Sequence, residues 1–148
     1  MDYHAECYCG VVKLAIQGDP VVQCYCHCSS CRKWSGQPVT ACILWPEAQV
    51  NIVAGRDQMH RHSNTDHPEG GKFSCKICGG AIGTFLPGSR MYDIFGGVLR
   101  DFTFQPSSHI NYQERVFDLV DGLPKFRDMP EMAGGSGVML NEAERLAP

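Results

Sequence analysis

The sequence predicts a mostly β fold, a small single domain of antiparallel sheets with few short helices. The chain has 148 residues, 43% of them hydrophobic, which suits one domain with its own core. Short apolar runs alternate with polar residues, as in half-buried strands. Glycine, proline and asparagine interrupt these runs about every 8–12 residues, a spacing typical of antiparallel β proteins.

Five segments carry the alternating pattern that predicts strands. Within each, hydrophobic and β-branched side chains recur at about every second position, and such residues fit a pleated, half-buried surface. The segments are residues 11–16, 38–45, 50–53, 81–86 and 91–95.

Helical signals are few. A turn or two is expected over residues 29–34, and a second helix over residues 139–146. The polar, turn-rich segment 62–71 predicts a surface loop between two strands. The glycine-rich segment 132–137 belongs to an expected C-terminal tail, so we expect a folded domain over residues 1–131 and a tail over 132–148.

Charge and composition argue against several classes of protein. The formal net charge is −3 with scattered lysine and arginine, which predicts no binding to nucleic acid or an anionic membrane. No apolar run approaches the roughly 18 residues that a membrane span needs. The N-terminal MDYHAEC lacks the basic start and apolar run of a secretory signal, which favours a cytoplasmic, reducing location. The nine cysteines are an odd number, and metal binding is therefore favoured over a set of disulfides.

Two cysteine pairs far apart in the sequence predict one closed metal site. Cys7 and Cys9 are separated by one residue, which on an extended strand places both thiols on one face. Cys75 and Cys78 are separated by two residues in a tight turn, and the glycines that follow can adopt the positive φ that such a turn often requires. Four thiolates suit tetrahedral zinc at about 2.3 Å per bond, and a four-cysteine site without an open position is structural.

Four more cysteines fall within the eight residues CYCHCSSC at positions 24–31. Cys26, Cys28 and Cys31 could bind a second zinc ion with one position left open, as catalysis requires. Alternatively, Cys24 could complete a closed four-cysteine site, and the residues alone leave both arrangements open. The basic pair RK at 32–33 would offset the thiolate charge and attract an anionic substrate.

The remaining histidines and cysteines suggest no further metal site. His27 is expected to point to the face opposite Cys26 and Cys28, and Cys42 is expected to be a small core residue. The other histidines lack ligand spacing and are expected in loops or on the surface. They are His4, His60, His62, His67 and His109.

With both cysteine groups placed, the chain resembles the family of glutathione-dependent formaldehyde-activating enzymes and centromere protein V. The resemblance covers about residues 3–130, and two interleaved zinc motifs in this order are far more specific than any one pair. The matching segments are CYCGVV at 7–12, CHCSSCRK at 26–33 with Gly36, CKICG at 75–79, GVL at 97–99, PSSHI at 106–110 and DGLPKF at 121–126. The departures are the additional Cys24, Arg100 where aspartate is common, and Phe117 where tryptophan is common.

The resemblance implies a zinc-stabilised fold of tent-like β sheets with two zinc ions. The structural ion would be held by Cys7, Cys9, Cys75 and Cys78, and the functional ion by Cys26, Cys28 and Cys31, with Cys24 as a possible fourth ligand. The implied activity is that of a carbon–sulfur lyase, which forms S-(hydroxymethyl)glutathione from glutathione and formaldehyde. Arg32 and Lys33 are then candidates to contact the glutathione carboxylates. The alternative is a non-catalytic, zinc-stabilised binding module.

Overall fold

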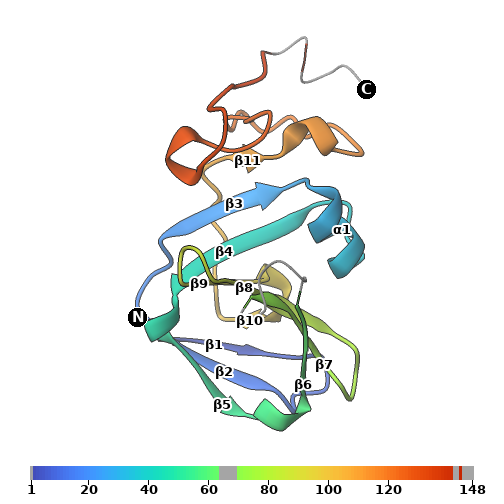
Figure 1. Cartoon of the computed structure of the whole chain (residues 1–148), viewed down its shortest axis with the longest axis vertical. Helices are drawn as coiled ribbons and strands as arrows, with labels where there is room; N and C mark the ends of the chain where they lie inside the picture. Colours follow the sequence, from blue (N-terminus) through green and yellow to red (C-terminus); the bar gives the residue numbers. More distant parts are fainter. Residues whose placement is uncertain (1, 64–69, 142–143, 145–148) are drawn as a thin grey trace. The chain divides into compact units, whose positions relative to one another are not determined.

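The structure is a computed structural model that describes residues 2–63, 70–141 and 144, and it is mostly β (Figure 1). The strands are β1 (Asp2–Glu6), β2 (Lys13–Gln17), β3 (Val22–Cys26), β4 (Thr40–Pro46), β5 (Val50–Ala54), β6 (Met59–His62), β7 (Gly71–Cys75), β8 (Ala81–Leu86), β9 (Met91–Ile94), β10 (Leu99–Arg100) and β11 (His109–Ile110). The described α-helix is α1 (Ser29–Ser35), and short 3₁₀ turns cover Glu47–Gln49, Arg56–Gln58, Gly96–Val98, Tyr112–Glu114 and Glu131–Ala133.

The chain divides into two compact units. Unit 1 comprises Met1–Val22 and Cys42–Phe104, and unit 2 comprises Gln23–Ala41 and Gln105–Pro148. The chain passes from one unit to the other within β3, within β4 and after Phe104. Each unit therefore contains residues that are far apart in the sequence.

Unit 1 is built from antiparallel strands. One sheet has the order β10-β1-β2-β5, and β4, β9, β8, β7 and β6 pair in that order (Figure 1). Alternation explains which side of each strand is buried: in β2, Leu14 and Ile16 are buried, whereas Lys13 and Gln17 are exposed. The buried hydrophobic cluster consists of Ala5, Cys7, Val12, Leu14, Ile16, Ile43, Trp45, Val50, Cys75, Ile82 and Ile94.

Trp45 lies at the centre of this core. Its side chain is fully buried, and the indole N–H donates to the carbonyl of Gly18 at 3.0 Å. The ring centroid of Tyr3 lies 6.0 Å from that of Trp45 and 5.2 Å from that of Phe102. A buried indole whose N–H has a partner contributes a large apolar area without an unsatisfied donor, which makes Trp45 a core residue.

Unit 2 contains one pair of parallel strands and much less regular structure. His109 in β11 is in register with Tyr25 in β3, and Ile110 with Cys26. The helix α1 follows β3 after two residues and ends at Gly36, whose φ of 70° is left-handed and whose N–H donates to the carbonyl of Arg32. Glycine takes this conformation at low cost, which explains why the helix stops there.

The five predicted strands and the helix at residues 29–34 are confirmed as β2, β4, β5, β8, β9 and α1. The remaining strands were not predicted as separate elements, and the β3–β11 pair is parallel. The predicted loop at 62–71 lies between β6 and β7, with residues 64–69 outside the described part. In the described chain, no helix is both long and apolar enough to cross a membrane.

The C-terminal segment packs against unit 2 as far as it is described. Met139 forms a bridge with Phe126, and Leu140 is buried and donates its backbone N–H to Lys125. The helix predicted over 139–146 does not include Met139, and most of its remaining residues lie outside the described ones. The boundary expected between residues 131 and 132 stays a prediction.

Replacing Gly83 by alanine tests the close packing of β8 against β9. A Cβ at Gly83 would lie 2.2 Å from the carbonyl oxygen of Asp93, whereas a Cβ at Gly88 would meet nothing within 4 Å. Because the backbone must move to relieve this contact, Gly83→Ala is expected to lower the unfolding free energy by about 1–3 kcal/mol. Gly88→Ala is the control, with an expected change within about 0.5 kcal/mol. Equal denaturant midpoints for the two variants would contradict this packing.

Candidate metal centres

Unit 1 brings together the two cysteine pairs that the sequence predicted to share one ion. The Sγ atoms of the four residues all lie within 4.8 Å of one another. The Sγ of Cys9 lies 3.6 Å from that of Cys7 and 3.8 Å from that of Cys75. Tetrahedral zinc with Zn–S bonds of about 2.3 Å separates its sulfur ligands by about 3.8 Å. The four thiols Cys7, Cys9, Cys75 and Cys78 therefore fit a zinc ion.

Two tight turns present these sulfurs. After β1, the Gly10 N–H donates to the Cys7 carbonyl at 2.9 Å, and after β7 the Gly79 N–H donates to the Cys75 carbonyl at 2.8 Å. Gly10 has φ 74° and Gly79 has φ 72°, a conformation that glycine adopts readily. The positive φ predicted from the glycines that follow Cys78 is confirmed at Gly79.

The crowded thiols differ strongly in acidity. The backbone N–H of Val11 acts to lower the pKa of Cys9, but burial and the neighbouring sulfurs, Cys7 first, raise that pKa to about 11. The backbone N–H groups of Gly80 and Cys9 lower the pKa of Cys78 to about 6. Thiols this close cannot all ionise without a cation, and a divalent ion that deprotonates its thiol ligands removes this conflict.

The second cysteine motif lies in unit 2, at the end of β3 and the start of α1. The Sγ atoms of Cys26 and Cys31 lie within 4.8 Å of each other. Cys28 is the N-cap of α1, where its sulfur accepts the Cys31 N–H at 3.3 Å. Hydrogen bonding to the sulfurs of Cys26 and Cys31, together with burial, raises the pKa of Cys28. All three thiols therefore interact in one short loop.

Arg32 joins this loop to the turn that follows β11. Its Nε donates to the His27 carbonyl at 3.0 Å, and a terminal nitrogen donates to the Glu114 carbonyl at 3.1 Å. The Glu114 carboxylate in turn accepts the backbone N–H of Ser29 at 2.8 Å. Lys33 is exposed. Two of the five N–H donors of Arg32 are thus used within unit 2, and Lys33 is the more accessible of the two basic residues.

The two cysteines outside the motifs are both buried, Cys24 in β3 and Cys42 in β4. Among the described residues, Cys24 belongs to no group of three or more potential ligand atoms within 4.8 Å. His4, His60 and His62 are exposed on strands, and His67 lies outside the described residues.

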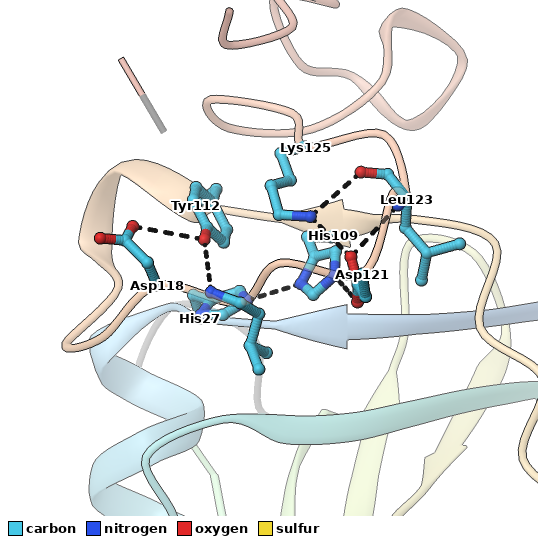
Figure 2. A network of polar contacts seen from close by, with 8 residues as sticks. His27, His109, Tyr112, Asp118, Asp121, Leu123 and Lys125 are labelled. Carbon is cyan, nitrogen blue, oxygen red and sulfur yellow. Dashed lines mark hydrogen bonds and ion pairs between the residues drawn. The ribbon is translucent and has the colours of Figure 1, made fainter. Parts of the chain in front are cut away.

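His109 is the residue that the sequence analysis misplaced. It was expected in a loop or on the surface, but it lies in β11 with no exposed area. Its Nδ1 lies 2.9 Å from Nε2 of His27, and its Nε2 lies 2.7 Å from a carboxylate oxygen of Asp121 (Figure 2). Burial, and then His109, lower the pKa of His27 to about 4. The sequence signal for this cluster was the resemblance noted for PSSHI at 106–110 and DGLPKF at 121–126.

Comparison with known proteins identifies a matching family model and a solved structure of similar fold. The family model described as glutathione-dependent formaldehyde-activating enzyme matches residues 2–114. A crystal structure of a protein from Rhodobacter sphaeroides shows the same fold, with a TM-score of 0.55 and 17% sequence identity over 68% of this chain and 90% of that chain. No protein among the curated ones matches. The segment DGLPKF at 121–126 lies beyond the family match.

Replacing Cys9 by serine tests the four-cysteine site. Cys9 is exposed, so the substitution removes one ligand with little effect on packing. We expect zinc per chain to fall by one equivalent and the melting temperature of unit 1 to drop, since structural zinc is worth about 10–16 kcal/mol in small domains. Metal analysis and thermal unfolding measure both. Tyr8→Ala is the control because its side chain is 93% exposed between the two ligands. Unchanged zinc content in Cys9→Ser would exclude the site.

Proposed function

Because the chain belongs to the glutathione-dependent formaldehyde-activating enzyme family, we propose that it is a zinc-dependent carbon–sulfur lyase that acts on a thiol–aldehyde adduct. The proposed reaction joins glutathione and formaldehyde to S-(hydroxymethyl)glutathione. The proposed ions are a structural zinc held by Cys7, Cys9, Cys75 and Cys78, and a second zinc held by Cys26, Cys28 and Cys31, with Cys28 interacting with the other two thiols. The second of these carries the chemistry.

The observation that carries this proposal is the three-thiol loop at the start of α1. Three sulfurs that interact within six residues form a ligand set of the size that catalytic zinc sites use. Three thiolates leave a zinc unit with a charge of −1, whereas four leave −2. The smaller charge retains more ability to polarise a further ligand, which is why the open arrangement favours an enzyme over a purely structural role.

The chemistry is the addition of a thiol to a carbonyl. The glutathione sulfur forms a bond to the formaldehyde carbon, the carbonyl π bond breaks, and the thiol proton ends on the carbonyl oxygen. When bound, zinc supplies a positive charge that deprotonates a coordinated thiol, which at its ordinary pKa near 8.5 is mostly protonated. The protein holds the two reactants together and so replaces an encounter in solution by a contact within one site.

The residues proposed to bind glutathione are the two basic ones that follow Cys31. Lys33 is exposed and carries a positive charge on a flexible stem. Arg32 keeps three N–H donors beyond its two contacts with carbonyls. We assign Lys33 to attract a glutathione carboxylate and Arg32 chiefly to hold the loop against Glu114.

A cytoplasmic, reducing location is part of this proposal. Glutathione in its thiol form is abundant only where disulfides are kept reduced.

The rate of the condensation tests the proposed function. Zinc-loaded protein is expected to accelerate the exchange between glutathione and its hydroxymethyl adduct, as measured by NMR exchange spectroscopy at equilibrium. Cys28→Ser is expected to reduce the enzyme-dependent exchange at least about 100-fold, a typical loss when a group acting in the transition state is removed. Ser30→Ala is the control, because Ser30 is exposed in α1. An exchange rate equal to the uncatalysed one would leave the non-catalytic binding module as the function.

Substitution of Cys24 tests whether the second zinc keeps an open position. Cys24→Ser is expected to leave two zinc ions per chain and the exchange activity unchanged, because among the described residues Cys24 belongs to no group of three potential ligand atoms. Metal analysis and the extended X-ray absorption fine structure of zinc count the sulfur ligands. Loss of one sulfur ligand in Cys24→Ser would identify Cys24 as a fourth ligand and the site as closed.

A further inference from the structure

A continuous hydrogen-bond network runs through unit 2, from the buried side chains of His27, His109 and Lys125 to the partly exposed carboxylate of Asp121. His27 Nε2 lies 2.9 Å from His109 Nδ1, and His109 Nε2 lies 2.7 Å from one carboxylate oxygen of Asp121. The other carboxylate oxygen accepts from Nζ of Lys125 at 2.7 Å, and Lys125 also donates to the carbonyl of Leu123 at 3.1 Å. Figure 2 shows His109 between His27 and Asp121, with Lys125 beside the same carboxylate.

These contacts determine which atom is the donor and which the acceptor in each hydrogen bond of the network. Asp121 is ionised, since Lys125 and His109 outweigh the effect of burial and lower the pKa of Asp121 to about 2. An ionised carboxylate only accepts, so His109 must donate from Nε2. Lys125 already neutralises this carboxylate, and burial first, then Lys125, disfavour a charged His109. A neutral His109 then accepts at Nδ1, and His27 must donate from Nε2.

At the other end of the network, Nδ1 of His27 is an acceptor. A neutral His27 that donates from Nε2 has a bare lone pair on Nδ1. That atom is buried, and the described residues offer it no hydrogen-bond partner. The tautomer of His27 is therefore determined by its hydrogen bond to His109, which is oriented in turn by Asp121.

His27 lies between two of the proposed zinc ligands, and its backbone is held on both sides. Its N–H donates to the carbonyl of Ile110 at 3.1 Å, and its carbonyl accepts from Nε of Arg32 at 3.0 Å. The ring packs edge-on against Tyr112 at a centroid distance of 4.7 Å. With the backbone and the ring both fixed, Cys26 and Cys28 can turn little about their own backbones.

We propose that Asp121 and His109 are positioning residues for the second metal site. They hold the His27 ring in one tautomer and one orientation, and this preorganises the loop that carries Cys26 and Cys28. The inference rests on the proposed function in one respect: it requires the second metal site, but not the proposed reaction. Groups that orient metal ligands typically contribute 10–100-fold to metal affinity, and the same range is expected here.

The test compares Asp121→Asn with Asp118→Asn in the full-length protein loaded with Co²⁺. Asp118 is the matched control, because it pairs with Arg115 in the same unit and its side chain is 32% exposed against 31% for Asp121. Cobalt–thiolate absorption with a competing chelator resolves the two sites. Asp121→Asn is expected to weaken the second site about 10–100-fold and to leave the four-cysteine site unchanged, whereas Asp118→Asn should change neither.

The tautomer of His27 gives a second readout that needs no variant. In ¹⁵N-labelled, zinc-loaded wild-type protein, long-range proton–nitrogen correlation should show a protonated Nε2 and a bare Nδ1 on His27, and a protonated Nε2 on His109. A protonated Nδ1 on His27 would overturn the inference even if Asp121→Asn does not fold. If the wild type binds two cobalt ions and the second-site affinity is equal in Asp121→Asn and Asp118→Asn, the inference is wrong but the proposed function stands. If the wild type binds a single cobalt ion, the second metal site does not exist and the proposed function fails together with the inference.

Discussion

The closeness of four thiols is the constraint on which unit 1 depends. The Sγ atoms of Cys9 and Cys75 are 3.8 Å apart although 66 positions separate the residues in the sequence. Cys7 directly follows β1 and Cys75 ends β7, so the group ties the turn between β1 and β2 to the turn between β7 and β8. A metal worth about 10–16 kcal/mol equals the whole stability of a typical small domain. The hydrophobic cluster of unit 1, which itself includes Cys7 and Cys75, packs around this tie.

Unit 2 is stabilised differently. The buried hydrophobic cluster lies in unit 1, whereas the large side chains of unit 2 that are at most 2% exposed are His27, His109, Tyr112 and Lys125. A buried polar network stabilises a fold only when its groups are satisfied, and it then specifies one arrangement. Lys125 shows this: its ammonium has a carboxylate and a carbonyl as partners and lies over the Tyr112 ring. The cost of burying this ammonium is offset by contacts that fit one geometry.

The sequence predicted what is encoded locally. Alternation predicted strands such as β2, and the glycine after Cys78 predicted the left-handed turn at Gly79, because both depend on neighbouring residues. The meeting of the two cysteine pairs was also predictable, since each pair alone supplies only two of the four ligands that a tetrahedral site needs. The contact between His27 and His109 was not, because the two residues are 82 positions apart and His109 lies in a strand of only two residues. Neither histidine has the spacing of a metal ligand, and a buried hydrogen-bond partner leaves no periodic pattern in the sequence.

The polar network and the proposed open metal site depend on each other through the flexibility of the loop. The helix α1 has seven residues and none of them is buried, so it is too short to be stable on its own and cannot fix its ligands by packing. A loose loop with three thiolates would lower its energy by rotating a further thiol onto the metal, and Cys24 is only two residues away. In the proposed site, rigid placement of Cys26 and Cys28 would prevent that rotation. The contacts of His27 with β11 and with Arg32 hold the loop, and a loop held in this way would keep one coordination position free for a substrate.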